Sequence, residues 1–236
     1  MTVPSKGGVP RARRPRGETR ARLVEACTEL IRAEGTASLT TERVAREVGI
    51  SQPGFYKHFD SLDALVLEGV GVVLEQGRSI LRGIRVAALA RFVTPQMLLS
   101  RDAVEPPVEA TLKVFVHDPR FAELFLRYRD DPTLFDGSVV ELDQRIRQEL
   151  SEDCWVVAQR LGARPEDYAR VAVYAEHMLA LFYVGCEQLL HQRFSLQLVV
   201  SSTSSALVAL NRGLLEDLAR AMGGNEAMVR LIRTLD

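Results

Sequence analysis

Apolar side chains recur with helical spacing along most of this chain, starting near its N-terminus. Between residues 23 and 31 they fall at i, i+3, i+4, i+7 and i+8, which is one face of a helix, and Gly35 follows. A second apolar face occurs within residues 44–48, and two phenylalanines lie four residues apart within residues 55–59. The pattern predicts three helices, of which the last two are short and separated by a glycine turn.

Capping residues mark the ends of these two short helices. Thr40 is an N-cap residue, and Gly49 suits the left-handed position at which a helix ends. Ser51 caps the next helix, and Pro53 is tolerated in a first helical turn because its missing N–H costs no bond there. The last helix is therefore expected over residues 52–59, and the pair forms a helix-turn-helix.

The second helix of this motif turns a polar face outward when its phenylalanines face the core. Its amide, phenol, ammonium and imidazole groups suit the base edges and phosphates of DNA. Gln52 and Lys57 are candidates for base contact, whereas Tyr56 and His58 are expected at phosphates. The residues expected at the DNA are Thr40, Thr41, Arg43, Gln52, Pro53, Gly54, Tyr56, Lys57 and His58.

Several short stretches carry a resemblance to a known family: Thr19-Arg20, Ala33-Glu34-Gly35, Leu39-Thr40-Thr41, Val44-Ala45, Gly49-Ile50-Ser51 and Phe55-Tyr56-Lys57-His58-Phe59. Together they make residues 17–77 similar to the N-terminal domain of the TetR family of transcriptional repressors. The resemblance implies an all-helical homodimer whose divergent C-terminal domain binds a small ligand and releases the DNA. Leu62 and Glu42 depart from the family pattern, and each removes a positive contact expected near phosphates.

Beyond residue 77 the periodicity stays helical, prolines punctuate the amphipathic runs, and no strand pattern occurs. Helices are expected at about residues 61–87, 94–101, 106–117, 119–129, 136–162, 165–192, 195–221 and 225–234. We therefore predict an all-α chain in three parts. These are a basic arm at residues 1–16, a three-helix DNA-binding domain at 17–77, and a larger helical bundle at 78–236 for ligand binding and dimerisation.

Charge is distributed unevenly along the chain, although the formal net charge is only -1. Residues 1–60 carry 11 Lys and Arg against 7 Asp and Glu, and the Pro- and Gly-containing first 22 residues hold seven of these basic side chains and one of the acids. Such a segment buries too little apolar area to order itself. It is either a solvated tail or an arm whose Arg11, Arg13 and Arg14 follow phosphates or enter the minor groove.

The last two long helices have the character of an association surface. A stripe of small side chains lets another helix approach closely: Ser202, Ala206, Ala209 and Gly213. A dimer bundle built from residues 165–192 and 195–221 of two chains fits this pattern, and an intramolecular contact is the alternative. Four glycines in the helix at 61–87 indicate either close packing or compliance between the domains: Gly69, Gly71, Gly77 and Gly83.

Candidates for a ligand site are the aromatic, sulfur and neighbouring polar side chains of the larger domain. Part of this set is expected to line an apolar cavity and the rest to form core. The residues expected at the ligand are Phe121, Phe125, Tyr128, Trp155, Tyr174, His177, Met178 and Phe182. The run at residues 118–129 is similar to a helix of fatty-acid-metabolism repressors of the same family, which nominates an acyl chain or its thioester as the effector.

Other chemistry finds little support in the sequence. Phosphate-loop, Gly-x-Ser-x-Gly and His-Glu-x-x-His motifs are absent, and Asp130-Asp131 before Pro132 is typical of a turn. His177, Glu187 and His191 share one expected helix but too few ligands for a metal site. The three cysteines are expected to be reduced core residues, with redox sensing as the alternative for the last two: Cys27, Cys154 and Cys186.

The sequence thus predicts a cytoplasmic, DNA-binding transcriptional regulator with no cofactor, metal or catalytic residue and no membrane partner. We expect a homodimeric repressor that leaves a near-palindromic operator when a small apolar effector binds. The alternatives are a ligand-blind dimeric DNA-binding protein and a helical-bundle enzyme. An interior without a cavity would favour the ligand-blind protein, whereas metal content or turnover without DNA would favour the enzyme.

Overall fold

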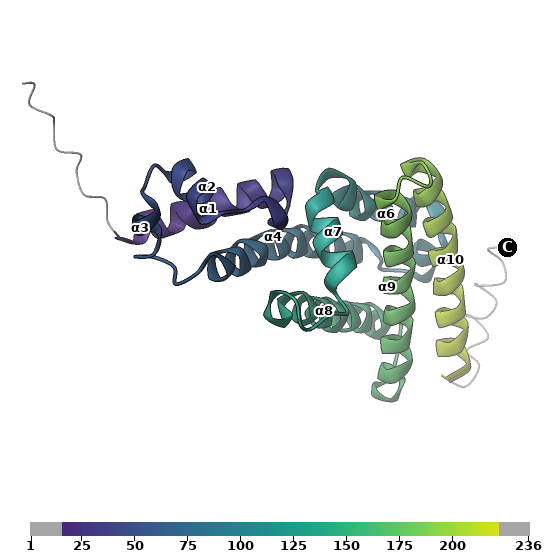
Figure 1. Cartoon of the computed structure of the whole chain (residues 1–236). Helices are drawn as coiled ribbons and strands as arrows, with labels where there is room; N and C mark the ends of the chain where they lie inside the picture. The colour runs from purple at the N-terminus through teal and green to yellow at the C-terminus, as the bar shows by residue number, and fades with distance from the viewer. Residues whose placement is uncertain (1–15, 222–236) are drawn as a thin grey trace, which may run out of the picture. The chain divides into compact units, whose positions relative to one another are not determined.

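A computed structural model describes residues 16–221 of the chain, and every regular element in this range is helical (Figure 1). The chain divides into two compact units, at residues 1–70 and 71–236. The expected terminal helix at 225–234 and the basic side chains of the arm lie outside the described residues. The all-α fold predicted from the periodicity is confirmed.

The first unit contains α1 (Arg16–Glu34), η1 (Thr36–Ser38), α2 (Thr41–Val48), α3 (Gln52–Phe55) and the start of α4 (Leu62–Arg91). Gly35, with φ of 84°, ends α1, and Gly49, with φ of 77°, ends α2. The core of the unit joins the apolar faces of these helices, and its fully buried members include Leu23, Cys27, Ile31, Val44, Phe55 and Leu65.

Helix α3 is shorter than the sequence predicted. It ends at Phe55, and the expected last turn, over residues 56–59, is a tighter one. The N–H of Lys57 donates to the carbonyl of Gly54 at 3.3 Å, and that of His58 donates to Phe55 at 2.8 Å. These i to i+3 bonds tighten the end of the helix. Phe59 still reaches the core, because the turn returns it to the same side as Phe55.

Helix α4 contributes its first turns to the first unit and the remainder to the second. Two of its glycines are closely packed: a Cβ at Gly69 would lie 3.0 Å from Ile31, and a Cβ at Gly77 would lie 2.4 Å from Phe121. A Cβ added at Gly71 or at Gly83 would meet no atom within 4 Å. Close packing therefore accounts for only two of the four glycines.

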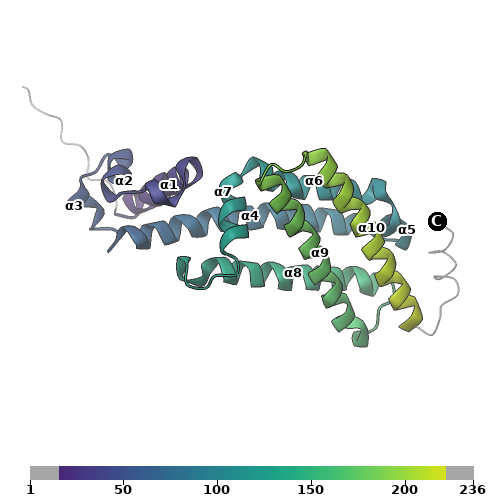
Figure 2. The ribbon, with the colours of Figure 1, turned by 45° about the vertical axis from the view of Figure 1, so that its right-hand side comes forward.

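Within residues 71–221, the second unit consists of the rest of α4 and six further α-helices with two short 3-10 turns. The bounds are α5 (Pro95–Leu99), α6 (Arg101–His117), α7 (Pro119–Tyr128), η2 (Phe135–Gly137), α8 (Ser138–Arg160), η3 (Pro165–Asp167), α9 (Tyr168–Leu190) and α10 (Leu196–Ala221). Helix α10 packs along α6 and α9, and α9 also packs on α8. Figures 1 and 2 show α9 and α10 side by side.

Helix α6 begins at Arg101, earlier than the predicted residue 106, and contains Pro106 and Pro107. Each proline removes one backbone hydrogen bond from the helix. Val104 and Val108, on either side of the pair, are 4% and 2% exposed. Burial of both side chains on one face holds this segment helical, so tertiary packing outweighs the local preference.

The three cysteines are buried and unpaired. Burial raises the pKa of Cys27 to about 11 and that of Cys154 to about 12, so both are neutral thiols near pH 7. Helix α10 is the one described helix long and apolar enough to cross a membrane, a test that the core helix of a helical domain also passes.

Candidate DNA interface and ligand cavity

The helix-turn-helix is held in shape by side-chain caps at both of its helices. The Thr40 hydroxyl oxygen accepts a hydrogen bond from the Arg43 N–H at 3.2 Å, and Ser51 Oγ accepts one from the Gly54 N–H at 3.2 Å. Each cap satisfies a backbone donor that the first turn of a helix leaves open. The two short helices therefore begin at fixed points on either side of Gly49.

Helix α3 and the following turn present a continuous polar face to solvent. Gln52, Pro53, Tyr56 and Lys57 are exposed, with Tyr56 at 53%, whereas Gly54 and His58 are half-buried. The opposite side is anchored by Phe55, which is fully buried and packs edge-on against the Tyr56 ring at 5.3 Å. The geometry thus leaves the expected base-reading and phosphate-contacting groups free to meet a groove of DNA.

Arg43 has a structural partner within the domain. Its guanidinium forms a two-point pair with Glu34 at the end of α1, and one of the two contacts measures 2.6 Å. The hydrogen bond from Arg43 holds the pKa of the Glu34 carboxyl below its usual value. The pair connects α1 to α2, so a DNA contact by Arg43 has to share or replace this bond.

Arg20 was not among the residues expected at the site, although it contacts Phe59 at the end of the turn that follows α3. Its guanidinium lies 4.6 Å from the centroid of the Phe59 ring and pairs with Glu68 at 2.5 Å. A cation over an aromatic face is attracted by the electrons of the ring. The contact fixes the end of the turn against α1 and α4. In the sequence, Arg20 could have been identified from the stretch Thr19-Arg20, which is part of the family resemblance.

The larger unit contains an apolar cavity of about 170 Å³ that is partly open to its surroundings. Each helix from α4 to α10 contributes to its wall. Most of the lining is aliphatic or aromatic, including Leu81, Ile84, Leu89, Phe92, Val104, Val108, Ile146, Leu150 and Val157. Such a mostly apolar cavity with few polar groups is typical of small-molecule sites.

Four of the residues expected at the ligand line this cavity: Phe125, Tyr174, Met178 and Phe182. The other four have different surroundings. Phe121 is fully buried between Phe115 and Phe125, and the Tyr128 ring packs against Phe135. The Trp155 ring packs edge-on against Tyr168, and His177 is exposed.

The cavity wall also contains a hydrogen-bonded pair, Tyr174 and Asn211, of which Asn211 was not expected from the sequence. Asn211 Nδ2 donates to the Leu98 carbonyl at 2.6 Å, which turns Oδ1 of the same amide toward the Tyr174 hydroxyl. Because Oδ1 can only accept, Tyr174 donates its proton to Asn211 and keeps its own lone pairs. Burial raises the pKa of the Tyr174 phenol, which stays protonated.

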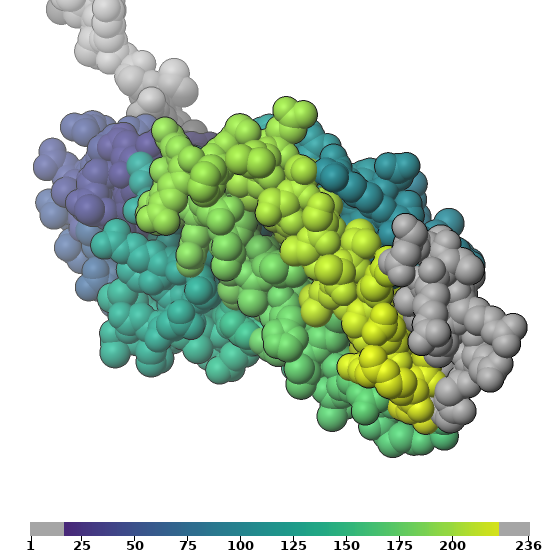
Figure 3. Space-filling view, turned by 90° about the vertical axis from the view of Figure 1, so that its right-hand side faces the viewer, coloured from purple at the N-terminus to yellow at the C-terminus, as the bar shows by residue number. Residues whose placement is uncertain are grey.

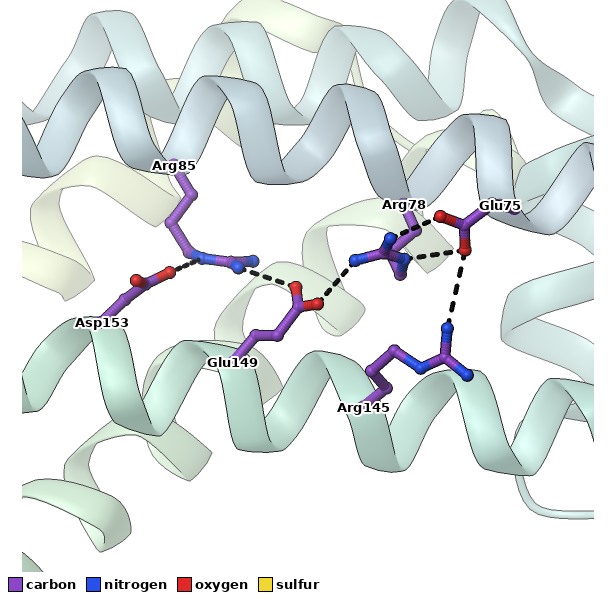
Figure 4. A network of polar contacts seen from close by, with 6 residues as sticks. All are labelled: Glu75, Arg78, Arg85, Arg145, Glu149 and Asp153. Atoms are coloured by element: carbon purple, nitrogen blue, oxygen red, sulfur yellow. Dashed lines mark hydrogen bonds and ion pairs between the residues drawn. The ribbon is translucent and has the colours of Figure 1, made fainter.

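Arg85 is the charged residue of the cavity wall, and it belongs to a row of ion pairs between α4 and α8 (Figure 4). Its Nε lies 2.5 Å from Asp153 and its Nη2 lies 3.0 Å from Glu149. Glu149 also accepts from Arg78 at 2.5 Å. Glu75 pairs with Arg78 and lies 3.8 Å from Arg145 at the far end. The six residues alternate in sign and carry equal numbers of opposite charges.

The family model described as bacterial regulatory proteins of the TetR family matches residues 23–68. These residues run from the buried face of α1 through the helix-turn-helix into α4. The N-terminal domain belongs to the TetR family. The chain is thus a transcription regulator with a TetR-type helix-turn-helix DNA-binding domain, as the resemblance implied.

Solved structures share the fold over most of their length. A protein named as a TetR-family transcriptional regulator from Mesorhizobium loti MAFF303099 matches at 14% identity and TM-score 0.64, covering 84% of this chain and 97% of that chain. A second TetR-family regulator, from Syntrophomonas wolfei str. Goettingen, matches at 13% identity and TM-score 0.61, covering 85% of this chain and 98% of that chain. A fatty acid degradation regulator from Bacillus halodurans matches at 14% identity and TM-score 0.53, covering 83% of this chain and 97% of that chain. At these identities the likeness establishes the TetR-like fold.

In this TetR-type chain, the side chains of α9 and α10 form a broad surface (Figure 3). Both helices carry exposed apolar side chains. Val173, Val184 and Leu198 are 56%, 53% and 55% exposed. Ser202, Ala209 and Gly213 of the small-residue stripe on α10 are exposed as well. We call this the α9/α10 face. Within residues 16–221 no cluster of three or more His, Cys, Asp or Glu side chains could hold a metal ion.

Proposed function

We propose that this TetR-type regulator is a ligand-responsive repressor. A homodimer, formed through the α9/α10 face, binds a near-palindromic operator in the cytoplasm and leaves it when a small apolar effector occupies the cavity. The polar face of α3 and the following turn reads the major groove, with Gln52 and Lys57 at base edges and Tyr56 and His58 at phosphates.

One observation carries the ligand response. The cavity wall includes Leu81, Ile84 and Arg85 of α4, and the same helix begins in the DNA-binding unit. A molecule that occupies the cavity therefore touches the covalent element that connects the two units. Release of DNA follows if the effector binds the DNA-incompetent form more tightly, since only differential affinity shifts an equilibrium between two states.

The cavity also weighs against the two competing functions. A ligand-blind regulator has no need for an apolar cavity in its interior, which costs packing energy. A helical-bundle enzyme needs reactive groups at such a space, but the polar groups of the described wall are a paired arginine, hydroxyls, a thiol of raised pKa and an amide. Neither a nucleophile with a base nor a cluster of acids lies there.

The test combines operator selection with effector release. Purified full-length protein is used to select fragments from random DNA, and the selected sequence is expected to contain two half-sites about one helical turn apart. Small molecules extracted from the protein are identified by mass spectrometry and titrated into the protein–DNA complex. Loss of operator affinity is the expected result, and an affinity that no extracted molecule changes would count against the ligand response.

A further inference from the structure

We infer that the effector is a small uncharged molecule of about the size of a monocyclic aromatic alcohol, not a charged acyl thioester. This inference rests on the proposed function, because it names the ligand class of the same cavity. Three properties of the wall carry it: the volume, the compensation of its one cation, and the hydrogen-bonding group at its α9–α10 side.

The volume limits how much of a ligand the cavity can take up. At about 170 Å³ the cavity is close to an engineered protein cavity of about 150 Å³ that takes up benzene. It is smaller than the roughly 300 to 1,000 Å³ of sites that hold drug-sized ligands. A ring with one short substituent fits this space. A long acyl chain with its nucleotide-bearing head group needs several times as much.

The charges at the wall limit the charge of the occupant. Arg85 is the one charged side chain among the described lining residues, and Glu149 and Asp153 already neutralise it. A ligand carboxylate beside Arg85 would face these two acidic groups and would add an uncompensated charge in apolar surroundings. Burying such a charge costs far more than burying a hydroxyl or carbonyl that finds a hydrogen bond.

The Tyr174–Asn211 pair provides the hydrogen bond that a neutral ligand needs. Tyr174 donates to Asn211 and keeps its oxygen lone pairs, while Asn211 Nδ2 has a second hydrogen beyond the one given to Leu98. Both residues line the cavity. A ligand hydroxyl can therefore donate to the phenol oxygen, and its own oxygen can accept from the amide.

Isothermal titration of the full-length protein with three small probes and one large one tests the inference. Benzyl alcohol, toluene and benzoate share one ring and differ in polarity and charge, and palmitoyl coenzyme A represents the acyl thioesters. At pH 7 we expect benzyl alcohol to bind at least 10-fold more tightly than benzoate. Palmitoyl coenzyme A is expected to show no one-to-one binding that depends on the cavity.

Two variants identify the site of binding. Tyr174→Phe keeps the ring and removes the phenol oxygen, so the ratio of benzyl alcohol affinity to toluene affinity should fall about 3- to 10-fold, as expected for one neutral hydrogen bond. Met178→Trp fills the cavity and should abolish binding of both probes. Val108→Phe fills it from α6 and replaces Met178→Trp if that variant fails to fold.

Benzoate binding as tight as benzyl alcohol binding, no binding of benzyl alcohol, or cavity-dependent binding of palmitoyl coenzyme A would each overturn the inference. An unchanged affinity ratio in Tyr174→Phe would overturn the role of the phenol oxygen. The proposed function fails differently. If benzyl alcohol binds in the cavity and no cavity-binding molecule alters operator affinity, the ligand class stands and the ligand response does not.

Discussion

At the turn between α2 and α3, Gly49 has φ of 77° and ψ of 34°, and its N–H donates to the carbonyls of Ala45 and Arg46. Any other L-residue in this left-handed conformation brings its Cβ close to the following carbonyl oxygen. A Cβ at Gly49 meets no neighbour within 4 Å, so the backbone cost is isolated from packing. Gly49→Ala should lower the free energy of unfolding by about 1 to 2 kcal/mol.

The measurement is urea unfolding of wild type, Gly49→Ala and Gly49→Asn. Asparagine visits the left-handed region more readily than alanine, so Gly49→Asn should lose less stability. Equal losses for the two variants would show that the left-handed conformation is not the cause.

Gln52 and Tyr56 are exposed on the same polar face, but their expected roles at DNA differ. Gln52→Ala should cost about 1 to 3 kcal/mol on the selected operator and relax the base preference at one position. Tyr56→Phe should weaken binding to operator and random DNA alike, because it removes a phosphate contact only. Fluorescence anisotropy with both duplexes measures the two effects. Parallel losses on operator and random DNA for both variants would refute the division of roles.

Much of this face could be predicted because its determinants are local. Caps at Thr40 and Ser51 and a phenylalanine pair four residues apart determine which side chains face outward. The Arg43–Glu34 pair and the Tyr174–Asn211 pair could not be predicted, since each joins different helices whose approach depends on the assembled fold.

At the scale of a single element, helix α4 has one glycine in crowded surroundings and another in open surroundings, so the same substitution can be compared at both. A Cβ at Gly77 would lie 2.4 Å from the ring of Phe121, which is fully buried and stacked on Phe125 at 5.8 Å. A Cβ at Gly83 would have no atom within 4 Å. Gly77→Ala should therefore destabilise the protein by about 1 to 3 kcal/mol through overpacking. Gly83→Ala should stabilise it by about 0.5 to 1 kcal/mol, because alanine is the better helix former.

Thermal unfolding followed by circular dichroism checks both glycine variants. The signs should be opposite although the helix and the substitution are the same. Two stabilising substitutions would mean that Phe121 gives way easily at Gly77. Two destabilising ones would mean that α4 needs flexible positions along its length, which is the compliance that the sequence left open.

The same helices show where sequence patterns mislead at this scale. Pro106 and Pro107 favoured a helix start at residue 106, whereas burial of the valines on either side extends α6 back to Arg101. The hydrophobic period identified each long helix correctly. The helix ends depend on contacts between elements, which the local sequence does not contain.

At the scale of the whole molecule, the α9/α10 face predicts how two chains associate. Leu198 is 55% exposed on this face, and a carboxylate introduced there would be buried unpaired in a dimer. Leu198→Glu should raise the dimer dissociation constant by at least 10-fold in sedimentation equilibrium and weaken operator binding in parallel. Val156→Glu, at a 46% exposed position on α8, is the matched control and should leave the dimer unchanged. Dissociation by both variants, or by neither, would place the dimer interface elsewhere.

The last prediction concerns the N-terminal arm, because residues 17–60 of the DNA-binding domain carry no positive excess of their own. Residues 17–60 carry 6 Lys and Arg against 7 Asp and Glu, whereas Lys6, Arg11, Arg13 and Arg14 precede the first described helix. If these side chains neutralise phosphates, deleting residues 1–15 should reduce the slope of log affinity against log salt concentration by about 0.9 for each lost contact. A full-length variant with the four basic residues changed to glutamine separates charge from length and should show the same reduction. A slope that neither change alters would identify the arm as a solvated tail and leave the attraction to DNA with Lys57 and the helix N-termini.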